Sequence, residues 1–488
     1  MLFNSAIFLF VFLPAVLAGW YLLNRFRFYR GALIFLSLSS FVFYAYFKPV
    51  YLFLILGSIA VNYLVIYLLH HAEKRREPIL AAGVLANLTL LGYFKYRDFF
   101  VGTVNTVFHS DFHLLHILLP LGISFYTIQQ LSCIIDAYRR QDCDPSFIEY
   151  VAYVSFFPQL VAGPIVFSGE LIPLFRDKEL RRFDPESFAE GVSLFILGLG
   201  KKMLLADLLG YVVDFGYEKI YWIDTASAWT IILCYTLQLY FDFSGYCDMA
   251  RGLGKMFRFS LPENFNRPLM AYSIKDFWDR WHMTLTRFFT HYLYIPLGGN
   301  RKGAVRTCIN IMLVFLISGL WHGASVTYVI WGGLHGLAVL FDRRKHFKSK
   351  PNLFFRTATF VFLVFSFTIF RSENMDFLRR MLTAMFSLKG AHFLPELCSC
   401  LADLPEFYMI TRAAEALAPA TLNILYMILL AMVLLIAGLL LHGENAARIV
   451  QNAKEKNFPL RFVLGVAFVF TCVVVSLNQV STFLYFNF

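Results

Sequence analysis

His322 is a side chain in this sequence that could perform acid–base chemistry in an apolar environment. It lies in Gly319-Leu320-Trp321-His322-Gly323, and no charged residue occurs from Thr307 to Phe341. A neutral imidazole accepts a proton near neutral pH, so it can act as general base for a hydroxyl group. The alternative is a core histidine satisfied by its neighbours. The flanking glycines favour catalysis, because they leave room for a substrate to approach the backbone.

A second histidine, His282, follows Asp276-Phe277-Trp278-Asp279-Arg280-Trp281, which is rich in aromatic and charged residues. In a helix, Asp279, His282 and Thr286 would share a face, and the carboxylate of Asp279 could fix the tautomer of the imidazole. The alternative is an interfacial helix whose histidine faces the headgroups and whose tryptophans belong to the aromatic belt. Spacing alone favours this alternative.

Polar residues also interrupt the apolar sequence in Phe241-Asp242-Phe243-Ser244-Gly245-Tyr246-Cys247-Asp248 and in Pro262-Glu263-Asn264-Phe265-Asn266-Arg267-Pro268. The second stretch predicts a break in regular structure. Irregular backbone at membrane depth persists only where it is buried in protein or lines a wet cavity. We therefore expect a tunnel beside the histidines. Lys201-Lys202 is expected to extend its charged ends to the cytoplasmic interface.

The composition requires elements that cross a membrane. Of 488 residues, 58% are hydrophobic and 15% are charged, whereas soluble chains carry about 25% charged residues. The net charge of +11 comes from short clusters between apolar runs, which indicates topology and anionic headgroups rather than nucleic acid. The eight cysteines lack the paired spacing of a zinc site or a disulfide framework, so we expect no metal. We also expect no bound cofactor. From residues alone, a transporter fits almost as well as an enzyme.

The apolar runs predict an all-α polytopic membrane protein, with about 11 to 13 membrane segments including re-entrant ones. The chain is expected to form a single membrane domain, 1–488, with an external loop region at 372–420 that contains amphipathic helices, and C-terminal spans at 421–488. The predicted segments are 4–23, 30–47, 49–70, 77–95, 115–135, 148–168, 186–214, 226–248, 305–321, 324–341, 353–371, 421–442 and 460–481.

Basic clusters predict the orientation. Arg25, Arg27 and Arg30 follow the first apolar run, and no basic residue precedes it, which indicates a retained span rather than a cleaved signal peptide. The clusters Lys74-Arg75-Arg76 and Arg139-Arg140 then fall on the same side if the spans alternate. This pattern places the N-terminus outside and the clusters in the cytoplasm.

Residues 120–342 resemble the membrane-bound O-acyltransferase (MBOAT) family, in particular its alginate O-acetyltransferase-like branch. The resemblance rests on an ordered series of motifs. They are Leu119-Pro120-Leu121-Gly122-Ile123-Ser124-Phe125-Tyr126, Phe156-Phe157-Pro158-Gln159-Leu160-Val161-Ala162-Gly163-Pro164-Ile165, Tyr240-Phe241-Asp242-Phe243-Ser244-Gly245-Tyr246, Pro262–Pro268, Asp276-Phe277-Trp278, Arg280-Trp281-His282, Tyr292-Leu293-Tyr294-Ile295-Pro296-Leu297-Gly298-Gly299-Asn300-Arg301 and Gly319-Leu320-Trp321-His322-Gly323.

The resemblance implies a central catalytic tunnel, with His322 as the catalytic histidine and His282 as its partner. It implies acetyl-CoA or an acyl carrier protein as cytoplasmic donor. The acceptor would be an extracellular or periplasmic polysaccharide, or a partner protein that acetylates one. The location would be the inner membrane of a bacterial cell. The candidate substrate-binding residues within the motifs are Tyr240, Asp242, Asn264, Trp278, Arg280, Trp281, Asn300 and Trp321.

Two alternatives remain from the sequence. One is D-alanyl transfer to teichoic acid from a carrier protein, and the other is polysaccharide transport without catalysis. The sequence departs from the family pattern at two places beside His282. Asp279 stands where a basic or amide residue is common, and Thr290-His291 stands where Arg-Asp is frequent.

Overall fold

A computed structural model describes the chain except for residues 141–143, 346–351, 418, 479–480 and 485–488. The described residues form helices joined by turns and irregular segments, without a strand. Their contacts divide the chain into two compact units that interleave along the sequence. Unit 1 comprises 1–195, 249–263 and 284–297, and unit 2 comprises 196–248, 264–283 and 298–488.

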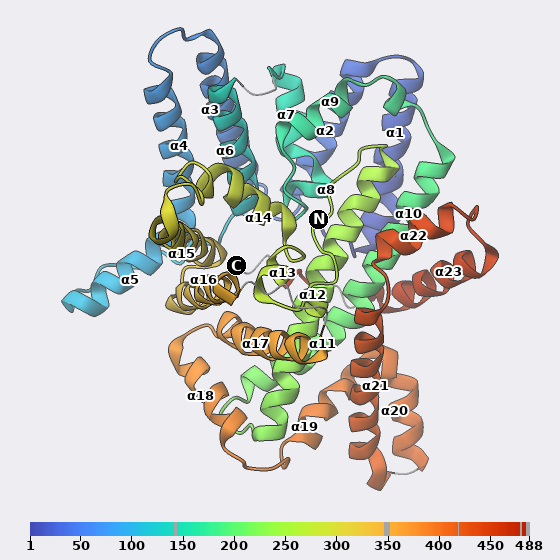
Figure 1. Cartoon of the computed structure of the whole chain (residues 1–488). Coiled ribbons are helices and arrows are strands. Elements are labelled where there is room, and N and C mark those ends of the chain that lie inside the picture. Colours follow the sequence, from blue (N-terminus) through green and yellow to red (C-terminus); the bar gives the residue numbers. More distant parts are fainter. Residues whose placement is uncertain (141–143, 346–351, 418, 479–480, 485–488) are drawn as a thin grey trace. The chain divides into compact units, whose positions relative to one another are not determined.

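Unit 1 holds the N-terminal helices, several of which run side by side (Figure 1). Apolar stretches of membrane-spanning length explain α1, α3 and α4. The helices are η1 (Phe8–Phe12), α1 (Leu13–Arg25), α2 (Tyr29–Ala45), α3 (Tyr51–His71), α4 (Arg76–Leu91), η2 (Gly92–Tyr96), α5 (Arg97–Phe108), α6 (Ile123–Arg139), α7 (Phe147–Ser155), α8 (Phe157–Leu160), α9 (Ser168–Arg176), η3 (Glu179–Arg181), α14 (Met283–Phe289) and η6 (Thr290–Tyr294).

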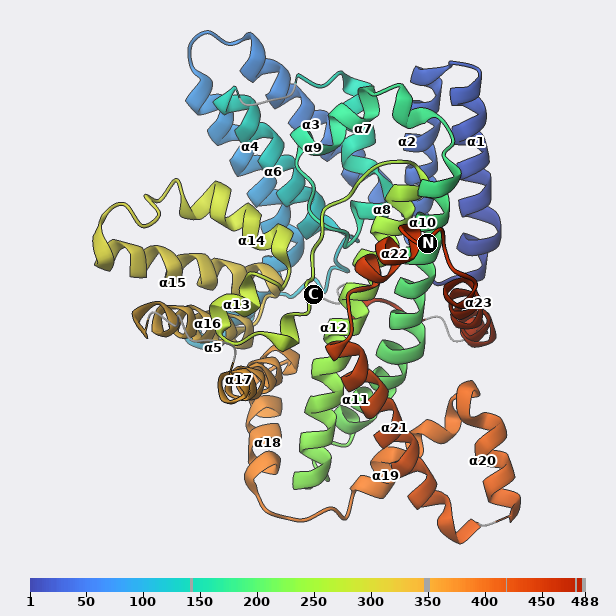
Figure 2. The same ribbon diagram turned by 45° about the vertical axis from the view of Figure 1, so that its right-hand side comes forward.

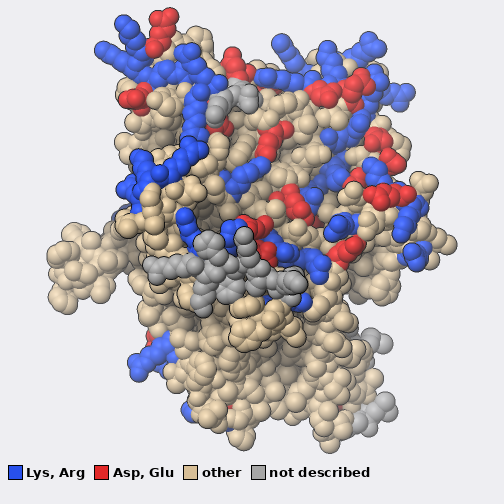
Figure 3. Space-filling view, viewed as in Figure 1, with Lys and Arg blue, Asp and Glu red and all other residues tan. Residues whose placement is uncertain are grey.

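The basic clusters predicted to share one side of the membrane lie at one end of unit 1. Figure 1 places the α1–α2 and α3–α4 turns at this end, and Figure 3 shows Lys and Arg gathered over both. The guanidinium of Arg76 donates to the carbonyl oxygens of Ala137 and Tyr138, at 2.9 and 2.7 Å, which joins the α3–α4 turn to the end of α6. This arrangement agrees with the predicted topology of the N-terminal spans.

Unit 2 holds the remaining helices. Helices α10 (Pro185–Gly200) and α12 (Thr225–Met256) contribute residues to both units, and Met283, the first residue of α14, also belongs to unit 2. Those of unit 2 are η4 (Lys201–Ala206), α11 (Asp207–Glu218), η5 (Pro268–Met270), α13 (Ile274–Trp278), α15 (Gly303–His322), α16 (Val326–Lys345), α17 (Leu353–Arg371), α18 (Met375–Phe386), α19 (Leu394–Ser399), η7 (Cys400–Asp403), α20 (Pro405–Leu417), η8 (Pro419–Thr421), α21 (Leu422–His442), α22 (Ala446–Lys454), α23 (Leu460–Val475) and η9 (Ser476–Asn478).

Helices α15 and α16 form a close antiparallel pair in unit 2 (Figures 1 and 2). A Cβ added to Gly319 would lie 2.3 Å from the carbonyl oxygen of Tyr328, and one added to Gly332 would lie 2.3 Å from that of Phe315. The ring of Tyr328 fills the space beside Gly323. The expectation that Gly319 and Gly323 leave room for a substrate beside His322 is therefore wrong, because residues of α16 occupy this space. Small residues of this kind let membrane helices approach closely.

The predicted all-α membrane fold is confirmed. Among the described residues, six helices are long and apolar enough to span a membrane: 8–25, 51–71, 76–108, 303–322, 353–371 and 422–442. Two shorter apolar helices cover 29–45 and 460–475. The predicted segment 148–168 is broken into α7 and α8, and the break precedes a proline, Pro158, at the start of α8. The region 372–420 contains α18, α19 and α20.

Candidate active site

His282 lies in a turn rather than in a helix. Helix α13 ends at Trp278, and His282 itself adopts a left-handed backbone conformation with φ of 45°. Two backbone hydrogen bonds tie this turn to the irregular segment before it: Asn266 N to Arg280 O at 2.9 Å, and Met283 N to Asn264 O at 3.0 Å. The continuous helix considered from the sequence is therefore wrong, because these backbone bonds replace the helical ones.

The side chain of Asn264 orients the imidazole of His282. Both side chains are buried. The amide nitrogen of Asn264 donates to the sulfur of Cys247 at 3.3 Å, which turns its Oδ1 toward His282 Nδ1, also at 3.3 Å. An amide oxygen can only accept, so the neutral imidazole carries its proton on Nδ1 and has its lone pair on Nε2. The carboxylate of Asp279, the partner considered from the sequence, is 58% exposed and pairs with Lys275 instead.

Replacement of Asn264 by alanine is expected to lower the rate of acyl transfer about 10- to 100-fold, because His282 loses the bond that selects its tautomer. Asn264→Asp, which keeps the accepting oxygen, should retain more activity than the alanine variant. Acyl transfer by purified protein measures both. Equal activity of Asn264→Ala and the parent would contradict this role.

His322 ends α15 and is 2% exposed. Its ring centroid lies 4.9 Å from that of Trp321, 5.2 Å from Trp331 and 5.4 Å from Phe370. The ring centroids of His282 and His322 are 6.4 Å apart. The two imidazoles thus share one buried aromatic cluster. The tunnel beside the histidines stays a prediction.

A third buried histidine, His335 on α16, supports this cluster and was not singled out as a site residue from the sequence. Its Nδ1 accepts a hydrogen bond from the indole N–H of Trp278 at 3.2 Å. Its ring packs on Trp331 with a centroid distance of 4.7 Å, and Trp331 in turn contacts His322. A sequence signal existed: Trp331 and His335 are one helical turn apart, so they lie on one face of α16.

Replacement of His335 by leucine is expected to reduce transfer about tenfold, because the indole N–H of Trp278 loses its buried acceptor and Trp331 loses a packing partner. His335→Asn places an amide oxygen near the position of Nδ1 and should restore part of the rate. The ratio of the two turnover rates at saturating donor measures the effect. Equal rates for both variants would contradict a hydrogen-bonding role.

The other predicted site residues divide into two groups. Trp281 contacts Phe265, which also contacts His282, and Trp321 contacts both catalytic candidates. Tyr240 also packs against Phe265, with ring centroids 6.3 Å apart. By contrast, Arg280 forms an ion pair with Asp276 at 2.7 Å, and Asn300 is exposed in the turn before α15. Substrate binding by these residues stays a prediction.

Asp242 belongs to a buried ion cluster centred on Lys202. The ammonium group of Lys202 lies 2.6 Å from Asp242 and 2.6 Å from Asp207, and its side chain is 2% exposed. The expectation that Lys202 reaches the interface is therefore wrong, because the buried carboxylate of Asp242 and the largely covered one of Asp207 hold it inside unit 2. Lys201 pairs with Asp248 at 2.6 Å, with 18% of its side chain exposed.

The C-terminal segment reaches this ion cluster. The hydroxyl of Ser481 donates to Asp207, the carbonyl oxygen of Thr482 accepts from Lys202 at 3.1 Å, and the backbone N–H of Leu484 donates to Asp242 at 3.0 Å. The ring of Phe483 packs beneath the ammonium of Lys202 and against Tyr246. Asp242 directly precedes Phe243, whose ring centroid is 4.8 Å from that of His282. The cluster therefore adjoins the imidazole pair along α12.

These features define an all-α, multi-pass membrane protein with a pair of buried histidines. Residues 110–372 match the model of the membrane-bound O-acyltransferase family, and the chain belongs to this family. It is thus an acyltransferase enzyme, and the predicted resemblance is confirmed.

Curated relatives agree with this assignment. The chain is 36% identical to a peptidoglycan O-acetyltransferase of Helicobacter pylori, over 100% of this chain and 98% of that protein. It is 42% identical to a probable alginate O-acetylase AlgI of Pseudomonas aeruginosa, over 79% of this chain and 75% of that protein. A teichoic acid D-alanyltransferase of Bacillus subtilis is 28% identical, over 52% of this chain and 69% of that protein.

Proposed function

We propose that this protein transfers an acetyl group from a cytoplasmic thioester, acetyl-CoA or an acyl carrier protein, to a hydroxyl group outside the cytoplasm. The acceptor is a cell-envelope polysaccharide or a partner protein that acetylates one. The protein acts in the inner membrane of a bacterial cell. The observation that carries this proposal is the pair of buried imidazoles, 6.4 Å apart, within the part of the chain that matches the family.

In this proposal the oxygen of the acceptor hydroxyl attacks the thioester carbonyl carbon, and the imidazole of His322 takes the proton of this hydroxyl. The tetrahedral intermediate then collapses, the C–S bond breaks, and the leaving thiolate takes the proton from the imidazolium of His322, which returns the imidazole to its neutral form. The new C–O bond is the acetyl ester. The apolar shell of aromatic rings keeps water away from the thioester and thereby limits hydrolysis.

The tautomer of His282 favours one of its possible roles. With Nδ1–H donated toward Asn264, Nε2 of the neutral ring can only accept a hydrogen bond. A hydrogen-bond acceptor such as Nε2 can pair with an O–H group of the substrate. It cannot pair with the oxyanion of the tetrahedral intermediate, because the oxyanion also accepts hydrogen bonds. The one proton of the attacking hydroxyl goes to His322, so we assign His282 to orientation of the acceptor through a neighbouring O–H group, rather than to stabilisation of negative charge.

Support for the acetyl group comes from the relatives. The peptidoglycan O-acetyltransferase matches this chain over its whole length, and the alginate O-acetylase is more than 40% identical, whereas the D-alanyltransferase is 28% identical over about half of this chain. An acetyl thioester as donor and polysaccharides outside the cytoplasm as acceptors are therefore the substrate classes proposed for this chain.

The test is ester analysis of the cell envelope by mass spectrometry after deletion of the gene. We expect acetyl esters on envelope polysaccharide to be lost, to return with the parent gene, and to stay absent with His322→Ala. Loss of D-alanyl esters with unchanged acetyl esters would overturn the choice of acyl group. Loss of glycan export, with acetylation intact in the His322→Ala and His282→Ala variants, would favour transport.

A further inference from the structure

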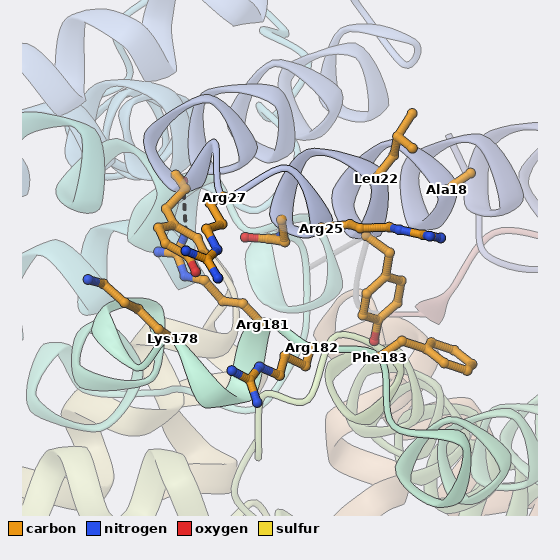
Figure 4. Close-up of a pocket in the computed structure, with 11 residues that line it drawn as sticks. Ala18, Leu22, Arg25, Arg27, Lys178, Arg181, Arg182 and Phe183 are labelled. Carbon is orange, nitrogen blue, oxygen red and sulfur yellow. Dashed lines mark hydrogen bonds between the residues drawn. The ribbon is translucent and has the colours of Figure 1, made fainter.

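Unit 1 contains a cavity of about 550 Å³ at its basic end. It is formed by the end of α1, the turn that leads into α2, and the segment that follows α9 (Figure 4). This cavity shares no residue with the histidine cluster of unit 2. It is therefore a separate candidate site.

Among the residues that the structure describes, five cationic side chains and no carboxylate line the cavity. Figure 4 shows that they come from two segments of the chain; they are Arg25, Arg27, Lys178, Arg181 and Arg182. One of the five, Arg182, pairs with a carboxylate outside the lining, Glu179, at 3.1 Å. Within the part of the chain that the structure describes, Arg25 and Arg27 form no ion pair. Such an excess of positive charge creates a strong attraction for an anion.

Arg181 is a buried cationic residue in the lining of the cavity. Its side chain is 5% exposed and lies over the rings of Trp20 and Tyr29, at 5.7 and 5.4 Å. The guanidinium donates to the carbonyl oxygens of Tyr29 at 2.7 Å and Phe175 at 3.1 Å. These carbonyl oxygens accept hydrogen bonds from the guanidinium, but they are uncharged and do not neutralise its positive charge. Among the described residues no carboxylate forms an ion pair with Arg181. A buried charge without such a partner is costly, so an anion bound here would offset that cost.

Exposed apolar side chains belong to the cavity lining or are next to lining residues in the sequence. Leu22, Phe26, Phe28 and Phe183 are 56%, 74%, 62% and 54% exposed, and Leu22 and Phe183 line the cavity itself. Helix α1, which ends here, belongs to a candidate membrane span, 8–25. Cationic groups beside exposed apolar side chains at the end of a span fit a molecule with a phosphate and hydrocarbon chains.

We propose that this cavity binds the phosphate headgroup of an anionic phospholipid. Lipid headgroups and soluble phosphorylated compounds both carry a phosphate group. The paired N–H groups of an arginine guanidinium can donate two parallel hydrogen bonds to phosphate oxygens. The exposed apolar side chains favour the lipid, because they provide a surface for acyl chains that a water-soluble anion would not use. Basic pockets at the cytoplasmic side of membrane helices are suited to such headgroups.

Native mass spectrometry of the purified full-length protein in detergent tests this proposal. The probes are phosphatidylglycerol, phosphatidylcholine and inorganic pyrophosphate. The cavity variant is Arg25→Gln/Arg27→Gln/Lys178→Gln, all exposed positions of the lining. Its matched control is Lys74→Gln/Arg75→Gln/Arg140→Gln, which removes three exposed charges of unit 1 that lie outside the cavity.

We expect the cavity variant to bind phosphatidylglycerol at least about tenfold more weakly than the parent, and the control variant to bind it like the parent. Phosphatidylcholine should bind weakly to all three proteins. Equal losses in the two triple variants would overturn the site. Pyrophosphate that binds the parent as tightly as phosphatidylglycerol, and loses affinity in the cavity variant, would overturn the lipid as ligand.

A second measurement does not depend on the variants. A photoreactive phosphatidylglycerol, reconstituted with the parent protein in vesicles, should label peptides that contain residues 18–29 or 178–183. Labelling confined to other parts of the chain would overturn the proposal.

Discussion

Replacement of His322 by alanine is expected to lower the turnover rate of acetyl transfer by about 10²–10⁴-fold. The imidazole is the proposed proton acceptor for the attacking hydroxyl, and alanine offers no replacement. The apparent KM for the thioester donor should change much less than the turnover rate, because a proton acceptor acts mainly in the transition state. Steady-state transfer from labelled acetyl-CoA by protein in vesicles measures both quantities.

The control for this variant must separate catalysis from packing, since His322 lies among Trp321, Trp331 and Phe370. His322→Phe fills the aromatic cluster with a ring that has no nitrogen. It should be as inactive as the alanine variant and should unfold at a temperature close to that of the parent. Substantial activity in His322→Phe would contradict the role of the imidazole as proton acceptor.

Replacement of Lys202 by methionine is expected to destabilise unit 2 by about 3–5 kcal/mol, because it leaves the buried carboxylate of Asp242 and the largely covered one of Asp207 without this cation. Asp242 and Asp207 both lie 2.6 Å from the ammonium that the variant lacks. The C-terminal segment, which binds the same three side chains, should be released as well. Thermal unfolding in detergent reports the stability, and protease accessibility of the C-terminal segment reports its release.

Lys275→Met is the matched control for this prediction. Lys275 pairs with Asp279 at 2.9 Å, but both side chains are more than half exposed. An exposed ion pair contributes about 0–1 kcal/mol, so this variant should unfold like the parent. Equal destabilisation by Lys202→Met and Lys275→Met would contradict the structural role of the buried ion cluster.

The membrane fold and several helix ends were predictable from the lengths of the apolar runs in the sequence. The predicted segments 353–371 and 421–442 correspond to α17 (Leu353–Arg371) and α21 (Leu422–His442), because long apolar runs have few alternatives to a helix in lipid. The two candidate catalytic histidines were also identifiable in sequence, from a histidine in an uncharged run and from the family motifs.

Features that depend on distant partners were not predictable. The sequence around His282 fits a helix, and its turn becomes apparent only with the backbone bonds to Asn264 and Asn266. The sequence around Lys202 is typical of a lysine at the membrane interface. Its ion pair with Asp242 was not predictable, because Asp242 lies on another helix. The glycines near His322 suggest open space, but helix α16 fills that space. In each case the local sequence leaves the partner unspecified.

The central claim is that His282 and His322 act together in acyl transfer. The most direct measurement is a single-turnover transfer of labelled acetyl in vesicles by the parent, His282→Ala, His322→Ala and the double variant. If the imidazoles work as one unit, the double variant should lose no more activity than His322→Ala alone. Losses that multiply in the double variant, or transfer that persists without both histidines, would contradict the claim.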